Sequence, residues 1–142
     1  MLIDANLLLY AVDSTAPAHA RATAWLTERL NGDQRVGIPW ESLTAFVRIV
    51  THPRATARPL RPEDAWAFVE DWLKVPNVWI PGPTERHADV FGSLVRKYRL
   101  TGNLIPDAHL AALAMEHGLQ VCSADTDFAR FTEIRWHNPV AG

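Results

Sequence analysis

Met1-Leu2-Ile3-Asp4-Ala5-Asn6 opens the chain with an apolar run that ends at a carboxylate, and residues 6 to 12 continue with a helical pattern. A short apolar run that stops at a polar residue is typical of a buried strand. In open parallel sheets, ligands bind at the carboxyl ends of the strands. These first residues therefore predict a buried strand whose end places Asp4 at a ligand-binding edge.

The rest of the chain repeats this alternation of strand and helix. We expect strands at residues 2–4, 35–38, 78–80, 119–123 and 134–137, and helices at residues 6–12, 18–30, 40–50, 62–73, 84–98 and 106–117. This order predicts an α/β fold with a central, mostly parallel sheet of about four to five strands and helices on both faces. No repeat or linker divides the chain, so residues 1–142 are expected to form a single domain.

Helical spacing also predicts which side chains are buried. Trp66 and Phe68 on helix 62–73 are expected to face the core, and so is Ala88 on helix 84–98. Trp40 has two interpretations. We favour a core tryptophan, because large aromatic side chains are mostly buried; the alternative is a platform on which a nucleic-acid base stacks.

The composition, with 48% hydrophobic and 21% charged residues, is typical of a soluble globular protein. No segment approaches the ~18 uninterrupted apolar residues of a membrane span. The N-terminal run also lacks the basic leader of a signal peptide. A single cysteine, Cys122, excludes an internal disulfide and fits a reducing compartment. We therefore expect a cytoplasmic protein with no membrane partner.

Basic residues form two groups in an otherwise slightly acidic chain. The net charge is −2 and the isoelectric point is about 6.3, which argues against an indiscriminate nucleic-acid binder, whose isoelectric point is usually above ~9. One group lies within residues 48–61 and the other within residues 96–99. Each is either a solvated helix face or a set of contacts to phosphate groups.

Four acidic residues stand where predicted strands give way to helices: Asp4, Glu41, Asp107 and Asp125. Because the carboxyl ends of parallel strands meet at one edge, we expect these side chains to converge. A carboxylate cluster with no matching cluster of bases calls for a hard divalent cation such as Mg²⁺ or Mn²⁺. Each acid taken singly has a second interpretation, as a helix cap or a first-turn acid. Their joint placement favours the metal site.

Small polar residues flank these acids. Asn6 and Ser123 are expected to orient a carboxylate or a bound water, and Asn103 to approach substrate from a loop. His109 follows Asp107 by two positions, an offset that places it on a different face of the helix. We interpret it as a surface or interface residue rather than a catalytic one. Zinc-binding spacing, a nucleophile elbow and a phosphate-binding glycine loop are all absent from the sequence.

Four segments together resemble one known family. They are Leu2-Ile3-Asp4-Ala5-Asn6, Trp40-Glu41-Ser42, Thr101-Gly102-Asn103-Leu104-Ile105-Pro106-Asp107-Ala108 and Ser123-Ala124-Asp125-Thr126-Asp127-Phe128. In this order they resemble the PIN-domain ribonucleases, and most of all the VapC toxins of bacterial and archaeal toxin–antitoxin pairs. The resemblance spans nearly the whole chain and predicts one PIN-like nuclease domain over residues 1–142.

The resemblance implies a function and a set of site residues. Asp4, Glu41, Asp107 and Asp125 become the catalytic, metal-binding acids, and Asp127 lies where some members place an additional acid. The family implies a Mg²⁺- or Mn²⁺-dependent endoribonuclease that hydrolyses RNA through metal-activated water. It also implies a homodimer and inhibition by a cognate antitoxin protein. The two basic groups, rather than the resemblance, supply the candidate RNA contacts, which are Arg48, Arg54, Arg96 and Arg99.

Acid clusters at strand ends also occur in two other classes of protein. A signalling receiver domain and an aspartyl-phosphate phosphatase both use Mg²⁺ and acids for phosphotransfer. Both call for a second acid close to Asp4, where this chain has Asn6, and for a lysine after a late strand. The chain has only Lys74 and Lys97, both within predicted helices, so phosphotransfer remains the alternative. A third interpretation is a PIN-like binding module without activity, which the presence of all four acids disfavours.

Overall fold

The computed structural model describes residues 1–142 as a five-stranded sheet between two groups of helices. The strands are β1 (Leu2–Ile3), β2 (Val36–Gly37), β3 (Val78–Trp79), β4 (Val121–Cys122) and β5 (Trp136–His137). The helices are α1 (Ala5–Val12), α2 (His19–Leu30), α3 (Trp40–Val50), α4 (Pro62–Lys74), α5 (His87–Tyr98), α6 (Leu104–His117) and the 3₁₀ helix η1 (Thr126–Arg130). No helix is long and apolar enough to span a membrane.

All four strand pairings are parallel, and the strand order is β3-β2-β1-β4-β5. The predicted α/β class with a central parallel sheet is therefore confirmed. From β1 the chain builds β2 and β3 on one side, then crosses over to place β4 and β5 on the other. The strand order thus reverses between β1 and β4, which is where parallel sheets bind ligands. Leu2 pairs with Val121 and Ile3 with Cys122, so both strands end together.

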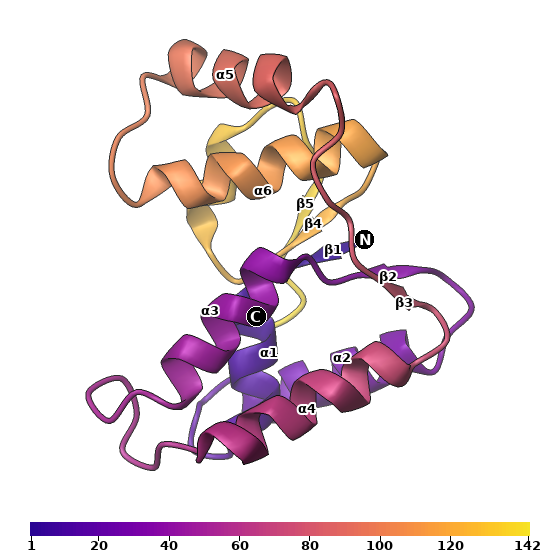
Figure 1. Cartoon of the computed structure of the whole chain (residues 1–142), viewed down its shortest axis with the longest axis vertical. Helices are drawn as coiled ribbons and strands as arrows, with labels where there is room; N and C mark the ends of the chain where they lie inside the picture. Colours follow the sequence, from indigo (N-terminus) through magenta and orange to yellow (C-terminus); the bar gives the residue numbers. More distant parts are fainter.

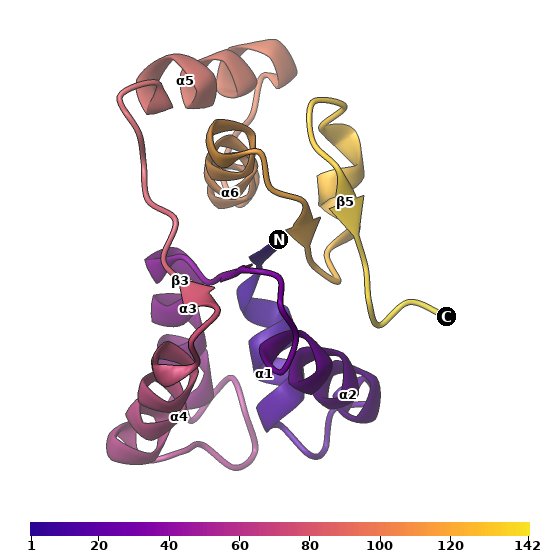
Figure 2. The ribbon, with the colours of Figure 1, turned by 90° about the vertical axis from the view of Figure 1, so that its right-hand side faces the viewer.

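Successive side chains of a strand point to opposite faces, and this alternation divides the core in two. Leu2 and Val121 pack into one hydrophobic cluster together with residues of α5, α6 and η1. Their neighbours Ile3 and Cys122 pack into the other cluster, with residues of α1 to α4. Figure 1 shows the two helix groups above and below the strands, and Figure 2 shows α5 and α6 separated from α1 to α4 by the strand layer.

Two predicted helix starts differ from the structure by two residues or more. Helix α6 begins at Leu104 rather than Pro106, because the backbone N–H groups of Leu104 and Ile105 already bond the carbonyls of Thr101 and Gly102. Pro106 then lies in the first turn, where its missing N–H costs no helical hydrogen bond. Helix α5 begins at His87 instead of residue 84.

The predictions of burial on the outer helix faces were wrong for several residues. Trp66 is 45% exposed and Phe68 37% exposed, and Ala88 is exposed as well. Trp40, for which we favoured a core position, is 44% exposed and its ring stacks on that of Trp66 at a centroid distance of 6.5 Å. Helical spacing identified apolar faces, but the neighbouring α3 covers Trp66 and Phe68 only in part.

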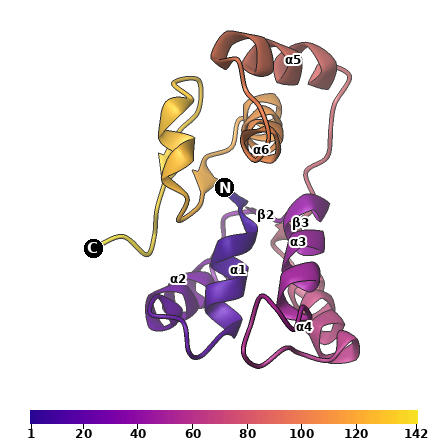
Figure 3. The same ribbon diagram turned by 90° about the vertical axis from the view of Figure 1, so that its left-hand side faces the viewer.

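The ends of the chain lie on different parts of the molecule. The N-terminus enters the middle of the sheet, whereas the C-terminal segment after β5 runs away from it, as Figure 3 shows. Arg21 on α2 fastens that segment by donating to the carbonyl oxygens of Ala141 and Gly142, at 2.9 and 3.0 Å.

Candidate active site

Three aspartates meet beyond the end of β4. Asp107, Asp125 and Asp127 each offer a carboxylate oxygen, and these oxygens lie within 4.8 Å of one another. Asp125 is the N-cap of η1, where its Oδ1 accepts the backbone N–H of Asp127 at 2.9 Å. Asp107 comes from the first turn of α6. The structure thus joins two of the four expected acids with the additional one that the family resemblance singled out.

Burial and the neighbouring carboxylates alter the protonation of Asp107. Its partial burial raises the pKa, the charges of Asp125, Asp4 and Asp127 raise it further, and the result is about 7. Crowded carboxylates of this kind are stabilised by a shared cation. The donor set consists of hard oxygens only, which fits a divalent cation such as Mg²⁺ and does not fit a soft metal.

Asp4 lies beside the cluster at the end of β1. Its Oδ1 accepts the backbone N–H of Ala5 at 2.8 Å, so Asp4 caps α1 as the alternative interpretation proposed. Its Oδ2 accepts the hydroxyl of Ser123 at 2.7 Å and the amide of Asn6 at 3.3 Å. Burial raises the pKa of Asp4, the hydrogen bonds from Ser123 and Ala5 lower it, and Asp125 raises it. Capping and membership of the acidic site therefore coexist in one residue.

Ser123 and Asn6 link the ends of β1 and β4. Ser123 is fully buried, and its Oγ accepts the side-chain amide of Asn6 and the backbone N–H of Asp125, both at 3.0 Å. The Oδ1 of Asn6 accepts the backbone N–H of Ala124 at 3.1 Å. Both residues hold the aspartates in place without joining the cluster. Asn103, by contrast, is exposed at the start of α6 and makes no side-chain hydrogen bond.

Glu41, in the first turn of α3, stands outside the group of three aspartates. Its Oε2 lies 2.9 Å from the Nε2 of His109. This hydrogen bond is the main reason that the pKa of Glu41 lies below its usual value, against the opposing effect of burial. His109 lies on a different face of α6 from Asp107, at an interface with α3 and α5, as its offset predicted, but sequence spacing does not reveal that Glu41 is its neighbour there.

The candidate RNA-contact arginines occupy separate surfaces. Arg48 on α3 lines a shallow groove together with Trp40, Trp66 and Val47. Arg54 lies exposed in the segment that joins α3 to α4. Arg96 and Arg99 lie at the C-terminal end of α5, where Arg99 adopts a left-handed backbone with φ 51°. Arg48 is therefore the arginine on the same helix as Glu41.

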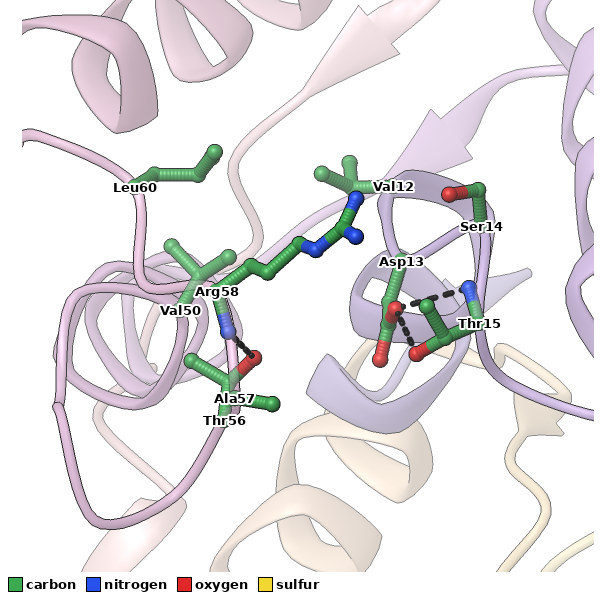
Figure 4. A pocket seen from close by; sticks show the side chains of 9 residues that line it. All are labelled: Val12, Asp13, Ser14, Thr15, Val50, Thr56, Ala57, Arg58 and Leu60. Atoms are coloured by element: carbon green, nitrogen blue, oxygen red, sulfur yellow. Dashed lines mark hydrogen bonds between the residues drawn. The ribbon is translucent and has the colours of Figure 1, made fainter.

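A second hollow lies at the far end of α1. It is lined by residues of the segments 12–15 and 56–60, together with Val50, and Arg58 extends across it (Figure 4). Since α1 has eight residues, this hollow lies about 12 Å along the helix from Asp4, at 1.5 Å per residue. It is therefore a feature separate from the acidic cluster.

Phosphotransfer chemistry requires a lysine beside the acids, and neither lysine of this chain is found in the acidic cluster. Lys74 ends α4, and Lys97 forms an exposed ion pair with Glu133 at 3.0 Å. These positions of the lysines give the phosphotransfer alternative no support.

Comparisons with known proteins agree with this geometry. The model of the PIN domain family matches residues 1–134. Ribonuclease VapC37 of Mycobacterium tuberculosis (strain ATCC 25618 / H37Rv) is 44% identical over 140 residues, which cover 99% of this chain and 97% of that protein. Ribonuclease VapC33 of Mycobacterium tuberculosis (strain CDC 1551 / Oshkosh) is 42% identical over 137 residues, 96% of each chain.

Solved structures share the fold at lower sequence identity. A chain of VapBC-1 from nontypeable Haemophilus influenzae superposes with a TM-score of 0.68 at 15% identity and covers 99% of this chain and 98% of that one. Mycobacterium tuberculosis VapC20 superposes with a TM-score of 0.66 at 19% identity, over 94% and 98% of the two chains. From the family model and the full-length relatives, the chain belongs to the VapC family of PIN-domain ribonuclease toxins.

Proposed function

We propose that this VapC-family ribonuclease is a divalent-metal-dependent endonuclease, which cleaves RNA phosphodiester bonds by hydrolysis at the acidic cluster. The observation that carries the proposal is the meeting of Asp107, Asp125 and Asp127 within 4.8 Å, with the pKa of Asp107 raised to about 7. A site that repels its own charges in this way is arranged to receive a cation rather than a neutral ligand.

Mg²⁺, with Mn²⁺ as an alternative, fits this oxygen-only donor set, and Asp107, Asp125, Asp127 and Asp4 would hold it. When bound, such a cation supplies positive charge at the scissile phosphate and acidifies water. The protein supplies rigidity: Asp4 is fixed by three hydrogen bonds, from Ala5, Asn6 and Ser123. Because hydrogen bonds hold its orientation in advance, it keeps its place as substrate arrives.

Glu41 is suited to orienting the attacking water. The hydrogen bond from His109 keeps its pKa low, so the carboxylate is ionised at neutral pH and accepts hydrogen bonds. Its side chain is 39% exposed, which leaves it accessible to water and substrate. Attack by water, rather than by a ribose 2′-hydroxyl, gives linear products with 5′-phosphate ends.

Arg48, Arg54, Arg96 and Arg99 are the proposed contacts to the RNA backbone. Arg48 has the strongest support, because it lies on the helix of Glu41 and beside the exposed rings of Trp40 and Trp66. Flat exposed rings next to a cation offer stacking for a base and charge for its phosphate.

A cognate antitoxin and a second copy of the chain are the proposed protein partners. Solved structures with this fold include a toxin–antitoxin complex from Klebsiella pneumoniae and VapBC2 from Rickettsia felis bound to a DNA fragment from their promoter. Those complexes belong to those proteins; for this chain they support a search for a partner protein that blocks cleavage. The homodimer rests on the family resemblance.

Cleavage of total cellular RNA tests the proposal. Purified protein is incubated with RNA and Mg²⁺ or Mn²⁺, and the new 5′ ends are mapped. We expect cleavage that chelator abolishes and that Asp4→Asn and Asp107→Asn abolish, whereas Asp33→Asn, at an exposed loop position, cleaves normally. Cyclic phosphate ends, or cleavage that persists in chelator, would overturn the proposed chemistry.

A further inference from the structure

A chain of hydrogen bonds connects Glu41 to the interior of the protein. The Nε2 of His109 lies 2.9 Å from Glu41 Oε2. The other nitrogen of His109, Nδ1, lies 3.0 Å from the Nε2 of His87. The Nδ1 of His87 in turn lies 2.6 Å from the Oε2 of Glu116. Two imidazole rings thus bridge two carboxylates that come from different helices, α3 and α6.

Exposure rises steadily along this chain of four side chains. The side chain of Glu116 is 0% exposed, that of His87 16%, that of His109 22% and that of Glu41 39%. Glu116, the buried end of the network, is held by two further hydrogen bonds. Its Oε1 accepts the backbone N–H of Thr84 at 2.9 Å and the hydroxyl of Thr84 at 2.7 Å. The network therefore leads from a fixed, buried carboxylate to an accessible one.

The packing of α5 against α6 holds the two rings between the carboxylates. His109 and Glu116 are seven residues apart on α6, which is two helical turns and places them on one face. His87, the first residue of α5, lies between them. The ring of Phe91, one turn further along α5, packs against both imidazoles at centroid distances of 5.4 and 5.5 Å. Neither ring can rotate freely in this arrangement.

The hydrogen-bond pattern assigns roles to all four ring nitrogens. Ionised carboxylates only accept, so both outer contacts need an N–H, and the central contact needs one N–H and one acceptor. The two rings together therefore supply three donors and one acceptor to these contacts. Charge-assisted hydrogen bonds of this kind are shorter and stronger than neutral ones. Every ring nitrogen is already engaged, so the rings are not arranged to converge on a metal ion.

We propose that His109, braced by His87 and Glu116, is a positioning residue that fixes the Glu41 carboxylate relative to the acidic cluster. The inference rests on the proposed function, in which Glu41 orients the attacking water. Helix α6 provides the link, because it carries both Asp107, a member of the cluster, and His109. A glutamate has three side-chain torsions, and at its level of exposure Glu41 would sample several rotamers without this contact.

Ring-nitrogen NMR tests the contact without any measurement of activity. With ¹⁵N-labelled histidine, we expect a downfield proton on His109 Nε2 in the parent protein. The signal shifts upfield in Glu41→Ala, which removes the acceptor, and it broadens or shifts in His87→Ala, which removes the brace. His137→Ala, at an exposed residue of β5, leaves it unchanged. An identical His109 signal in the parent and in Glu41→Ala overturns the proposal.

Steady-state cleavage kinetics then test what the contact does. We expect His109→Ala to lower kcat by about 10- to 100-fold, the usual effect of losing a partner that orients a site residue, with KM changed less than about twofold. His109→Gln can still donate from its side-chain amide to Glu41 and should recover most of kcat. Thermal melts confirm that each variant is folded, and His137→Ala serves as the matched control.

The two experiments separate the two ideas. Equal loss of kcat in His109→Ala and His109→Gln, or a change confined to KM, contradicts the positioning role even if RNA is cleaved. If the parent protein cleaves no RNA, the proposed function fails and the NMR comparison alone decides whether Glu41 is held.

Discussion

Ser123 donates its hydroxyl to Asp4 across 119 positions of sequence, at an Oγ–Oδ2 distance of 2.7 Å. This contact ties the end of β4 to the end of β1 at the point where the strand order of the sheet reverses. The Oγ of Ser123 also accepts hydrogen bonds from the side-chain amide of Asn6 and from the backbone N–H of Asp125. One buried hydroxyl thereby fixes the relative position of two candidate metal ligands.

Ser123→Ala is expected to weaken both stability and the site. It leaves the Asp125 N–H without its acceptor, removes one of the two acceptors of the Asn6 amide and removes a donor to Asp4, at a cost of about 1–3 kcal/mol in the free energy of unfolding. The pKa of Asp4 should rise further, because the hydrogen bond from Ser123 lowers it. Urea denaturation measures the loss. Ser93→Ala, at an exposed position of α5, is the control, and equal stability of the two variants would contradict the assigned role.

Asp107 should make the metal-free protein less stable as pH rises. Its pKa is about 7 in the folded protein and near 3.8 otherwise, so the folded state holds this proton more tightly. Stability contributed by the group is therefore present below about pH 4 and is lost as pH rises toward 7. Since the side chain is partly exposed, solvent screening limits the effect to on the order of 1 kcal/mol.

Asp107→Asn should remove this pH dependence. In chelator, the variant is expected to melt at a higher temperature than the parent at pH 7.5 and at nearly the same temperature at pH 4.5. Asp33→Asn should follow the parent at both values. If the melting temperatures of the parent and of Asp107→Asn change equally between pH 4.5 and pH 7.5, the carboxylates of the acidic cluster do not repel one another.

Divalent metal should stabilise the parent by mass action. At a concentration about 100 times the dissociation constant, Mn²⁺ should add about 2.7 kcal/mol to the free energy of unfolding. Asp125→Asn removes one carboxylate of the group, so its melting temperature should respond much less. Differential scanning calorimetry with and without Mn²⁺ measures both, and no shift in the parent would count against a metal site.

Arg48 should contribute to RNA affinity through charge alone. Arg48→Ala is expected to weaken binding of short RNAs of unrelated sequence by similar factors and to reduce the slope of log affinity against log salt by about 1. Arg135→Ala is the control, because Arg135 directly precedes the edge strand β5, whereas α3, which carries Arg48, follows β2 on the other side of β1. Fluorescence anisotropy at several salt concentrations gives the slope, and an unchanged slope would place the RNA elsewhere.

Trp66 and Trp72 on α4 should differ sharply in their effect on stability. Trp72 is 7% exposed and its ring lies 4.9 Å from that of Phe46, whereas Trp66 lies on the surface. Trp72→Ala is expected to cost about 3–5 kcal/mol, and Trp66→Ala about 0.5 kcal/mol or less. Urea denaturation of both variants checks this, and similar losses would mean that the Trp40–Trp66 pair is part of the core.

The sequence by itself determined the order of the strands and α-helices and, to within one residue, where each strand ends. Short apolar runs such as Met1–Ile3, helical spacing and turn residues act locally, so their physical consequences are readable from neighbours in the chain. Because parallel strands end at one edge, the sequence also predicted that acids following β1 and β4 would lie near each other, and the charge of Asp125 does contribute to raising the pKa of Asp4.

Only the tertiary structure decided which faces are covered and which polar groups meet. Spacing marked Trp66 as core-facing, but the ring that stacks on it is that of Trp40 on α3, itself 44% exposed, so Trp66 stays 45% exposed. His109 offered no local signal, because its partners Glu41 and His87 come from α3 and α5. Such contacts depend on how helices pack across the sheet, which is set by the sum of many side-chain volumes rather than by any short segment.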